Sequence, residues 1–138
     1  MARGPADFLA REWRRRTERF VRELERATVE ATDAVYAASR QALQSSIYNV
    51  PVPTYRNKRG REVPLWRRTG NLRRSERRRA AGLTGIIYNE ASYARERHER
   101  GRGTEYPRKA HWRDEAVSAA AAEVRRIYRD AVKRALAT

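Results

Sequence analysis

The chain has 138 residues, the length of a single domain, which excludes a multidomain enzyme with separate cofactor and substrate lobes. Lysine and arginine total 32 against 17 acidic residues, and this net charge of +15 favours an anionic or acidic partner. Cysteine is absent, which excludes disulfide scaffolds, cysteine nucleophiles and cysteine zinc sites. No apolar run approaches the ~20 residues of a membrane span, so we expect a soluble protein made inside the cell.

The charge is concentrated in the middle of the chain. Residues 1–50 carry nine basic and seven acidic side chains, residues 51–113 carry eighteen and six, and residues 114–138 carry five and four. The single domain therefore divides into parts with net charges of +2, +12 and +1. Arginine outnumbers lysine 29 to 3. A GC-rich genome is the favoured explanation of that ratio, and selection for guanidinium groups, which bind carboxylates and phosphates through two hydrogen bonds, is the alternative. The codon explanation does not account for where the charge lies.

Residues 1–50 are predicted to form one long helix, with Pro5 and Asp7 suited to its first turn. Apolar or small residues follow at steps of about four and three: Leu9, Trp13, Phe20, Leu24, Ala27, Ala31, Val35, Ala38 and Ala42. Forty residues make a helix of about 60 Å, longer than a domain of this size is wide. Such a helix either bends around its own core or contacts another subunit through Trp13, Phe20 and Leu24.

The first half of the basic middle part is predicted to form a hairpin or a protruding loop. Pro51 and Pro53 exclude a helix where they stand. The polar turn Asn57–Arg61 lies between two short extended segments, residues 53–56 and 62–66.

A second hairpin is expected further along. Residues 75–80 and 83–89 flank Ala81-Gly82, and the second segment contains Ile86, Ile87 and Tyr88, which favour strand. Residues 91–100 are expected to form a short helix and residues 101–103 a loop.

Residues 114–138 are predicted to form a second helix, because Asp114 and Glu115 suit its start and Lys133 and Arg134 its last turns. One face carries Val117, Ala121, Val124, Tyr128, Ala131 and Ala135. Antiparallel pairing of the two terminal helices is the simplest core. The expected class is α+β: a long amino-terminal helix, one small antiparallel sheet with extended loops, and a carboxy-terminal helix packed on the first.

The arginine run in the middle part is the strongest functional signal. Seven arginines fall within the thirteen residues 67–79, with Trp66 directly before them and Leu72 among them. On a strand, Arg77 and Arg79 would share one face and Arg78 would lie on the other. We expect contact with DNA or an acidic partner at Arg56, Lys58, Arg59, Arg61, Arg67, Arg68, Arg73, Arg74, Arg77 and Arg79. The alternative is a solvated surface with counter-ions.

No motif that reads base sequence is visible, so any contact with DNA would be to its backbone and would weaken with salt. An enzyme is not expected, and neither is a metal or a cofactor. His98 lies in a charged run and His111 at a loop-to-helix junction, and neither has the spacing of a metal ligand. A small RNA-cleaving enzyme using arginine, tyrosine and histidine is the less favoured alternative.

Three segments, in order, resemble the tail-completion (neck, or head–tail joining) proteins of long-tailed bacteriophages. After a long helix and Pro64 comes Arg68-Thr69-Gly70-Asn71-Leu72-Arg73-Arg74-Ser75. A predicted strand pair follows, and then Tyr93, Ala94, Glu99 and Gly101. The third segment is Pro107-Arg108-Lys109-Ala110-His111-Trp112-Arg113, before a closing helix that includes Ala116.

The resemblance implies a structural virion protein without catalysis. Such proteins form a ring, six-fold in symmetry, that joins the capsid connector to the tail tube and lets DNA pass. A ring uses head-to-tail interfaces, so each subunit offers two different faces. The subunit interface is expected at Trp13, Phe20, Leu24, Trp66, Leu72 and Trp112. Expected partners are copies of the chain, other neck and tail proteins, and DNA in the lumen. The alternative is a basic nucleic-acid-binding protein without a virion role.

Overall fold

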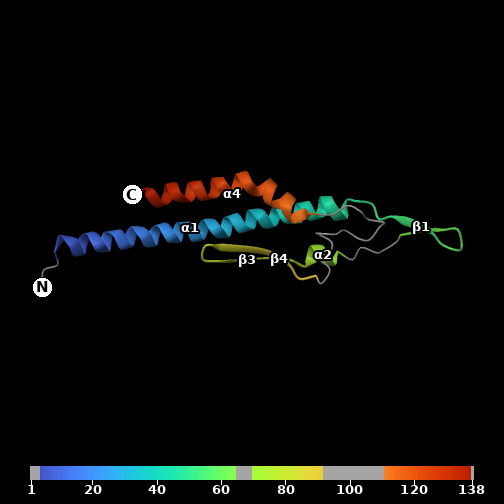
Figure 1. Ribbon diagram of the computed structural model, residues 1–138, viewed down its shortest axis with the longest axis horizontal. Coiled ribbons are helices and arrows are strands. Elements are labelled where there is room, and N and C mark those ends of the chain that lie inside the picture. Colours follow the sequence, from blue (N-terminus) through green and yellow to red (C-terminus); the bar gives the residue numbers. More distant parts are fainter. Residues whose placement is uncertain (1–3, 65–69, 92–110, 138) are drawn as a thin grey trace.

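The computed structural model describes residues 4–64, 70–91 and 111–137. Two long helices lie side by side and two hairpins extend beneath and beyond them (Figure 1). In chain order the elements are α1 (Pro5–Leu43), the π-helical turn η1 (Gln44–Tyr48), β1 (Thr54–Arg56), β2 (Glu62–Pro64), α2 (Asn71–Arg74), β3 (Glu76–Ala81), β4 (Thr84–Asn89) and α4 (Trp112–Leu136). The α+β class is confirmed, with the carboxy-terminal helix packed on the long amino-terminal one.

The two helices pack antiparallel. Tyr128 and Thr28 share a hydrogen bond of 2.7 Å between their hydroxyl oxygens. At the far end of the pair, the Ser46 hydroxyl donates to the Glu115 carboxylate at 2.9 Å. The 39 residues of α1 span about 58 Å and the 25 residues of α4 about 37 Å, so about 20 Å of α1 extends past α4.

The core consists of two small clusters along α1. The first joins Ala27 to Ile127 and Ala131. The second contains the larger side chains, with partners from η1, α2 and α4: Ala42, Leu43, Ile47, Leu72, Trp112 and Ala116. Alanine is a strong helix former with a short side chain, so the helices can approach closely where it lines the contact.

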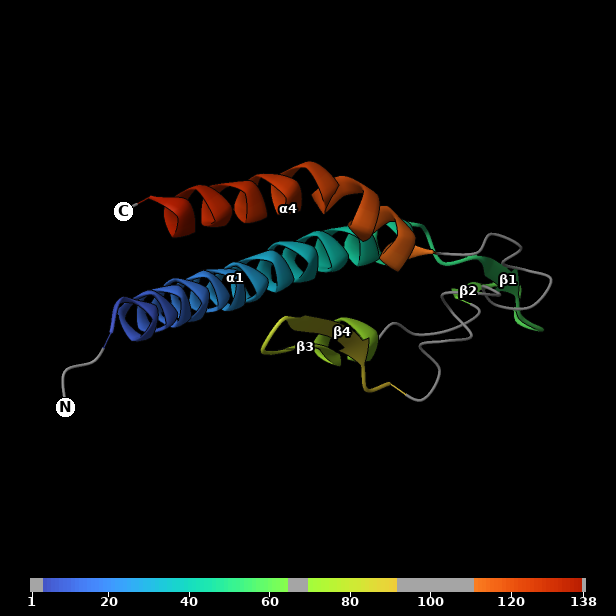
Figure 2. The ribbon, with the colours of Figure 1, turned by 60° about the vertical axis from the view of Figure 1, so that its left-hand side comes forward.

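Both predicted hairpins are present. Among the described residues they form two separate two-stranded antiparallel sheets, not the one small sheet that was predicted, because neither hairpin pairs with the other. The hairpin β3–β4 lies along α1 (Figure 2). The Nε of Arg78 lies 2.8 Å from a carboxylate oxygen of Asp33 on α1, while its neighbours Arg77 and Arg79 lie on the opposite face of the strand. The predicted alternation of the three arginines is therefore confirmed.

The predicted buried face of the carboxy-terminal helix is wrong in its first half. Trp112, Ala116 and Ala120 are buried, whereas Val117 is 59 % exposed. The helix begins at Trp112, two residues earlier than predicted, and the burial of this indole turns the face that starts with it toward α1. The predicted helix over 91–100 and the loop over 101–103 lie outside the described residues, apart from Ala91. No described helix is long and apolar enough to cross a bilayer.

Candidate partner and DNA interface

The tip of the β1–β2 hairpin presents four of the predicted contact cations. The carbonyl of the Asn57 side chain accepts hydrogen bonds from the backbone N–H groups of Arg59 and Arg61, each at 3.0 Å. Gly60 adopts φ of +75°, a conformation that favours glycine and closes the turn. Arg56, Lys58, Arg59 and Arg61 are all exposed, and none has an ion pair among the described residues.

This hairpin projects past the end of α1, away from both ends of the chain (Figure 1). Residues 54–64 carry four cations and one carboxylate, Glu62, a net charge of +3 on eleven residues. Because these cations are held by the turn and remain unpaired within the described chain, they are available to phosphate or carboxylate groups of a partner.

Three arginines of the predicted run are engaged within the molecule instead. The guanidinium of Arg73 donates to the Gln44 side chain at 2.9 Å and lies 4.9 Å from the ring centre of Tyr48. Arg77 donates to two backbone carbonyls and lies 3.6 Å from Glu90. Arg78 stacks on Tyr36 at 4.4 Å from its ring centre. The contacts of Arg73 hold α2 on η1, and those of Arg78 hold β3 on α1, which reduces what these arginines can offer a partner.

Arg79 differs from its neighbours. It is exposed and has no ion pair among the described residues. Ile86 pairs with it across the hairpin, and Tyr88 lies on the same outer face, each 38 % exposed. The outer face of β3–β4 is therefore mixed, apolar and cationic.

Of the three remaining predicted contact arginines, one lies within the described residues and two lie outside them. Arg74 is exposed on α2, and its backbone carbonyl accepts from Arg77. Arg67 and Arg68, with the predicted interface residue Trp66, lie outside the described residues.

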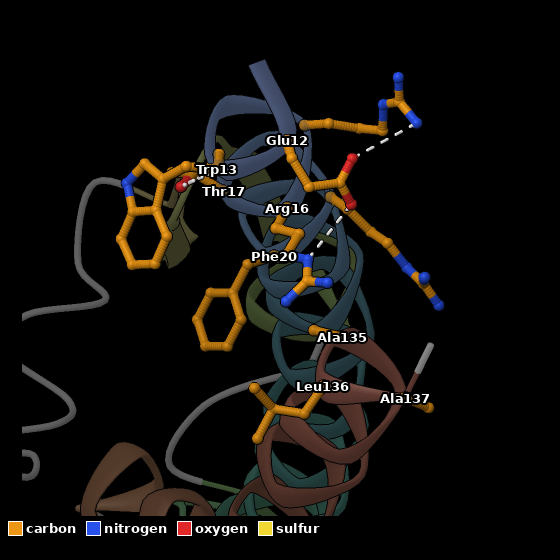
Figure 3. A pocket seen from close by; sticks show the side chains of 10 residues that line it. Glu12, Trp13, Arg16, Thr17, Phe20, Ala135, Leu136 and Ala137 are labelled. Atoms are coloured by element: carbon orange, nitrogen blue, oxygen red, sulfur yellow. Dashed lines mark hydrogen bonds and ion pairs between the residues drawn. The ribbon is translucent and has the colours of Figure 1, made fainter. Parts of the chain in front are cut away.

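The predicted subunit-contact residues of α1 lie where the helix passes the end of α4. Trp13 is 75 % exposed, and Phe20 and Leu24 are half-buried. A hollow of about 600 Å³, which we term the aromatic hollow, is lined there by Trp13 and Phe20 of α1 and Leu136 of α4, which lie along one side of the helix pair (Figure 3). The hollow is also lined by four charged residues, Glu12, Arg15, Arg16 and Arg19, and their net charge is +2.

Leu72 and Trp112 require a correction. They were expected at a subunit interface, but they are only 3 % and 1 % exposed within this single chain. Both pack in the cluster that joins α1, η1, α2 and α4, so they have almost no surface left for a neighbouring subunit.

A buried carboxylate that the sequence reasoning missed organises this end of the molecule. Glu76 is 1 % exposed. Its carboxylate accepts hydrogen bonds from the hydroxyl of Ser39 at 2.6 Å, from the indole N–H of Trp112 at 3.2 Å and from the guanidinium of Arg113 at 2.5 Å. The side chain of Asn89 lies 3.4 Å away as a fourth donor. Four elements, α1, β3, β4 and α4, therefore meet at one side chain.

The charge of Glu76 is compensated by Arg113. Burial lowers the pKa of Arg113 below its ordinary value, and the adjacent Glu76 carboxylate acts in the opposite direction. Arg113 also donates to the backbone carbonyl of Ile87, which satisfies a further part of its guanidinium. A buried ion pair with its hydrogen bonds satisfied in this way has a structural role in fixing β3–β4 against both helices.

Of the two histidines of the enzymatic alternative, the structure describes only His111. His111 adopts a left-handed conformation, with φ of +43°, before α4, and its Nδ1 lies 3.2 Å from the carboxylate of Asp114. His98 lies outside the described residues. Within residues 4–64, 70–91 and 111–137, no group of three or more histidine, aspartate or glutamate side chains could hold a metal ion.

Comparison with known proteins identifies no relative. Family models, curated proteins and solved structures all give no match to this chain.

Proposed function

We propose that this chain is a structural protein of the neck of a long-tailed bacteriophage, where copies form a ring between the capsid connector and the tail tube. The observation that carries the proposal is the free amino-terminal end of α1, which presents Trp13 at 75 % exposure. An isolated domain gains nothing from an exposed indole on a helix that extends past its own core, whereas an interface uses one as an anchor.

The order of the three motif segments supports the phage assignment. Of the first segment, Gly70 to Ser75 forms a compact turn, in which Leu72 enters the core and the Arg73 N–H donates to the Tyr48 hydroxyl at 3.0 Å. The cationic β1–β2 hairpin suits a neighbouring acidic ring or the DNA in the lumen. Such a surface acts through the number of its charges, because single exposed ion pairs are worth only ~0–1 kcal/mol.

The test is to measure mass by light scattering at several protein concentrations and to image the largest species by electron microscopy. Closed rings of one defined size are the expected result. A protein that stays monomeric at every concentration would contradict the proposal.

A nucleic-acid-binding protein without a virion role is the second candidate, favoured by the four exposed cations of the β1–β2 hairpin, which have no ion pair within the part of the chain that the structure describes. The salt dependence of duplex DNA affinity separates the two. Weak binding together with ring formation agrees with the neck protein. Tight, steeply salt-dependent binding by a monomer that forms no rings would favour the second candidate.

A further inference from the structure

The helix pair carries a second hollow, at the opposite end from the aromatic hollow. This alanine groove, of about 590 Å³, lies between α1 and α4 and is lined mainly by alanines, including Ala38 and Ala119. Among the described residues that line it, Glu115 and Glu123 carry the charge, which gives this lining a charge of −2. Along α1, Trp13 and Ala38 are 25 residues apart, about 38 Å of helix.

The two hollows are complementary in charge and in chemistry. The aromatic hollow has a lining charge of +2 and presents an exposed indole, while the alanine groove has a charge of −2 and no aromatic or large apolar side chain among its described lining residues. The side chains of Arg15 and Arg16 are 78 % and 67 % exposed, so they can reach a partner. A contact of the aromatic hollow with itself would instead bring arginines against arginines, which is unfavourable.

We infer that the aromatic hollow of one copy of this chain docks on the alanine groove of the next copy. Trp13 enters between the two helices of the neighbour, and Arg15 and Arg16 lie against its Glu115 and Glu123. The inference rests on the proposed function only in taking a second copy of the chain as the partner. Because the two hollows are different and lie at opposite ends, the contact is head-to-tail and repeats from copy to copy.

The hydrogen-bonding groups of the two hollows also fit. The indole N–H of an inserted tryptophan needs an acceptor, and a carboxylate has several lone pairs to offer. Glu115 already accepts from Ser46 at 2.9 Å, and Glu123 lies 3.6 Å from Arg126, which leaves acceptor positions on both. The chain contains the same pairing in its own core, where the Trp112 indole donates to Glu76 at 3.2 Å.

The contact can be tested by cross-linking, because the chain has no cysteine and each introduced thiol is unique. Thr17 lines the aromatic hollow and Ala119 lines the alanine groove, so a Thr17→Cys copy is mixed with an Ala119→Cys copy and treated with a short bis-maleimide. We expect a cross-linked dimer of the two variants. The control is Val29→Cys, which is 51 % exposed on α1 and lines neither hollow, and should cross-link about tenfold less.

Cross-linking of Thr17→Cys copies only to one another would show that the aromatic hollow pairs with itself, and would overturn the inference. A yield between Thr17→Cys and Ala119→Cys copies no higher than with the Val29→Cys control would overturn it as well.

Charge reversal is the second arm of the test. Arg15→Glu with Arg16→Glu, placed in the Thr17→Cys copy, should lower the yield about tenfold, and Glu115→Arg with Glu123→Arg in the Ala119→Cys copy should restore it. Circular dichroism checks that each variant remains helical. Failure of the reversed pair to restore the yield in folded variants would overturn the inference.

The outcome separates this inference from the proposed function. Closed rings formed without the contact between positions 17 and 119 would leave the neck protein standing and overturn the docking. The cross-link in open chains that never close would support the docking and contradict the ring.

Discussion

The Glu76 carboxylate is the point at which α1, both strands of the β3–β4 hairpin and α4 are joined. Its contacts come from three distant parts of the sequence: Ser39, Asn89, and the adjacent pair Trp112 and Arg113. Removing one member of a buried ion pair costs more than the pair itself contributes, because the remaining charge loses its compensation in a poorly solvated place.

Glu76→Ala is therefore expected to lower the free energy of unfolding by about 3 kcal/mol. The substitution removes the carboxylate that compensates the half-buried Arg113 and that accepts hydrogen bonds from the Ser39 hydroxyl and the Trp112 indole. Urea denaturation followed by circular dichroism measures the change. Glu90→Ala is the control, since Glu90 pairs with Arg77 at the surface and should cost less than about 1 kcal/mol. Equal losses of stability for both variants would contradict the structural role of Glu76.

Two tryptophans of this chain should respond in opposite ways to truncation. Trp112→Ala removes a side chain that is 1 % exposed and is expected to cost about 3–5 kcal/mol of stability. Trp13→Ala removes one that is 75 % exposed and should change the stability of the monomer by less than about 0.5 kcal/mol while weakening assembly. Urea denaturation at low protein concentration, together with light scattering at high concentration, measures both effects. A Trp13→Ala variant that assembles like the parent would contradict an interface role.

For single residues, the sequence predicted which side chains of the turn are exposed better than it predicted which side chains contact one another. Arg59 and Arg61 of the predicted polar turn are exposed, because a polar turn keeps its side chains in solvent. Glu76 was missed because its partner Arg113 is 37 residues away and no spacing rule connects them. A signal was present: Glu76 is the single acidic residue next to three arginines, on the strand face that carries Arg78 toward α1.

Among the elements, the β3–β4 hairpin lies so close to α1 that one position requires glycine. A Cβ atom at Gly85 would lie 1.9 Å from the Thr32 hydroxyl oxygen on α1. Thr32 is buried and cannot turn away freely, because its hydroxyl donates to the Thr28 carbonyl at 2.7 Å. The backbone of β4 therefore packs directly on the helix.

Gly85→Ala is expected to destabilise the protein by about 1–3 kcal/mol through overpacking. The combination with Thr32→Ala removes the clashing hydroxyl, so the double variant should lose less stability than the sum of the two single variants. Urea denaturation of the four proteins gives this coupling. Strict additivity would contradict the close approach of β4 to α1. Gly82→Ala is a control for the local loss of glycine, because nothing lies within 4 Å of a Cβ there, although its φ of +59° also disfavours alanine.

The β1–β2 hairpin is the element from which we expect salt-dependent binding to DNA. Replacing Lys58, Arg59 and Arg61 by glutamine should reduce the slope of log affinity against log salt by about 0.9 for each DNA phosphate that the hairpin no longer neutralises. The matched control removes three exposed cations of α4 instead, with Arg125→Gln, Arg129→Gln and Lys133→Gln, and should change the slope less. Fluorescence anisotropy with a labelled duplex measures both slopes. Equal reductions of the salt slope in the two triple variants would show that only the net charge of the protein matters, and would contradict a DNA-binding role of the hairpin.

The elements themselves follow well from local chemistry. Turn residues at Asn57–Arg61 and Ala81-Gly82 predict both hairpins, and the actual strands differ from the predicted ones by one or two residues. Whether two hairpins join into one sheet depends on contacts distant in sequence, which local signals do not contain. The buried face of α4 was misassigned for a similar reason, because its many alanines mark several faces almost equally and Trp112 decides between them.

On the scale of the whole molecule, the length of α1 was predictable from the absence of glycine and proline between residues 6 and 50. Its apolar stripe was predicted as one continuous feature, but the structure divides it: Ala27, Ala31 and Ala42 are buried, while Leu9 and Trp13 are 64 % and 75 % exposed. The stripe is divided into a buried and an exposed part because α4 is shorter than α1 and covers only part of it. The aromatic hollow arises because α4 is shorter than α1, and the alanine groove arises because short side chains line the other end of the helix pair. Neither hollow can be recognised until the two helices are packed together.

The uncovered end of α1 has a consequence for how the helix opens. A stretch of about fourteen residues is marginally helical in water without tertiary contacts, so its backbone amides should exchange with solvent deuterium far faster than those around Ala27 and Ala31. Within α1, amide exchange should therefore be fast at the amino-terminal end and slow around Ala27 and Ala31. Contact with another subunit would slow exchange at the amino-terminal end of α1. Deuterium uptake recorded by mass spectrometry would then report assembly without an attached dye or a substituted residue.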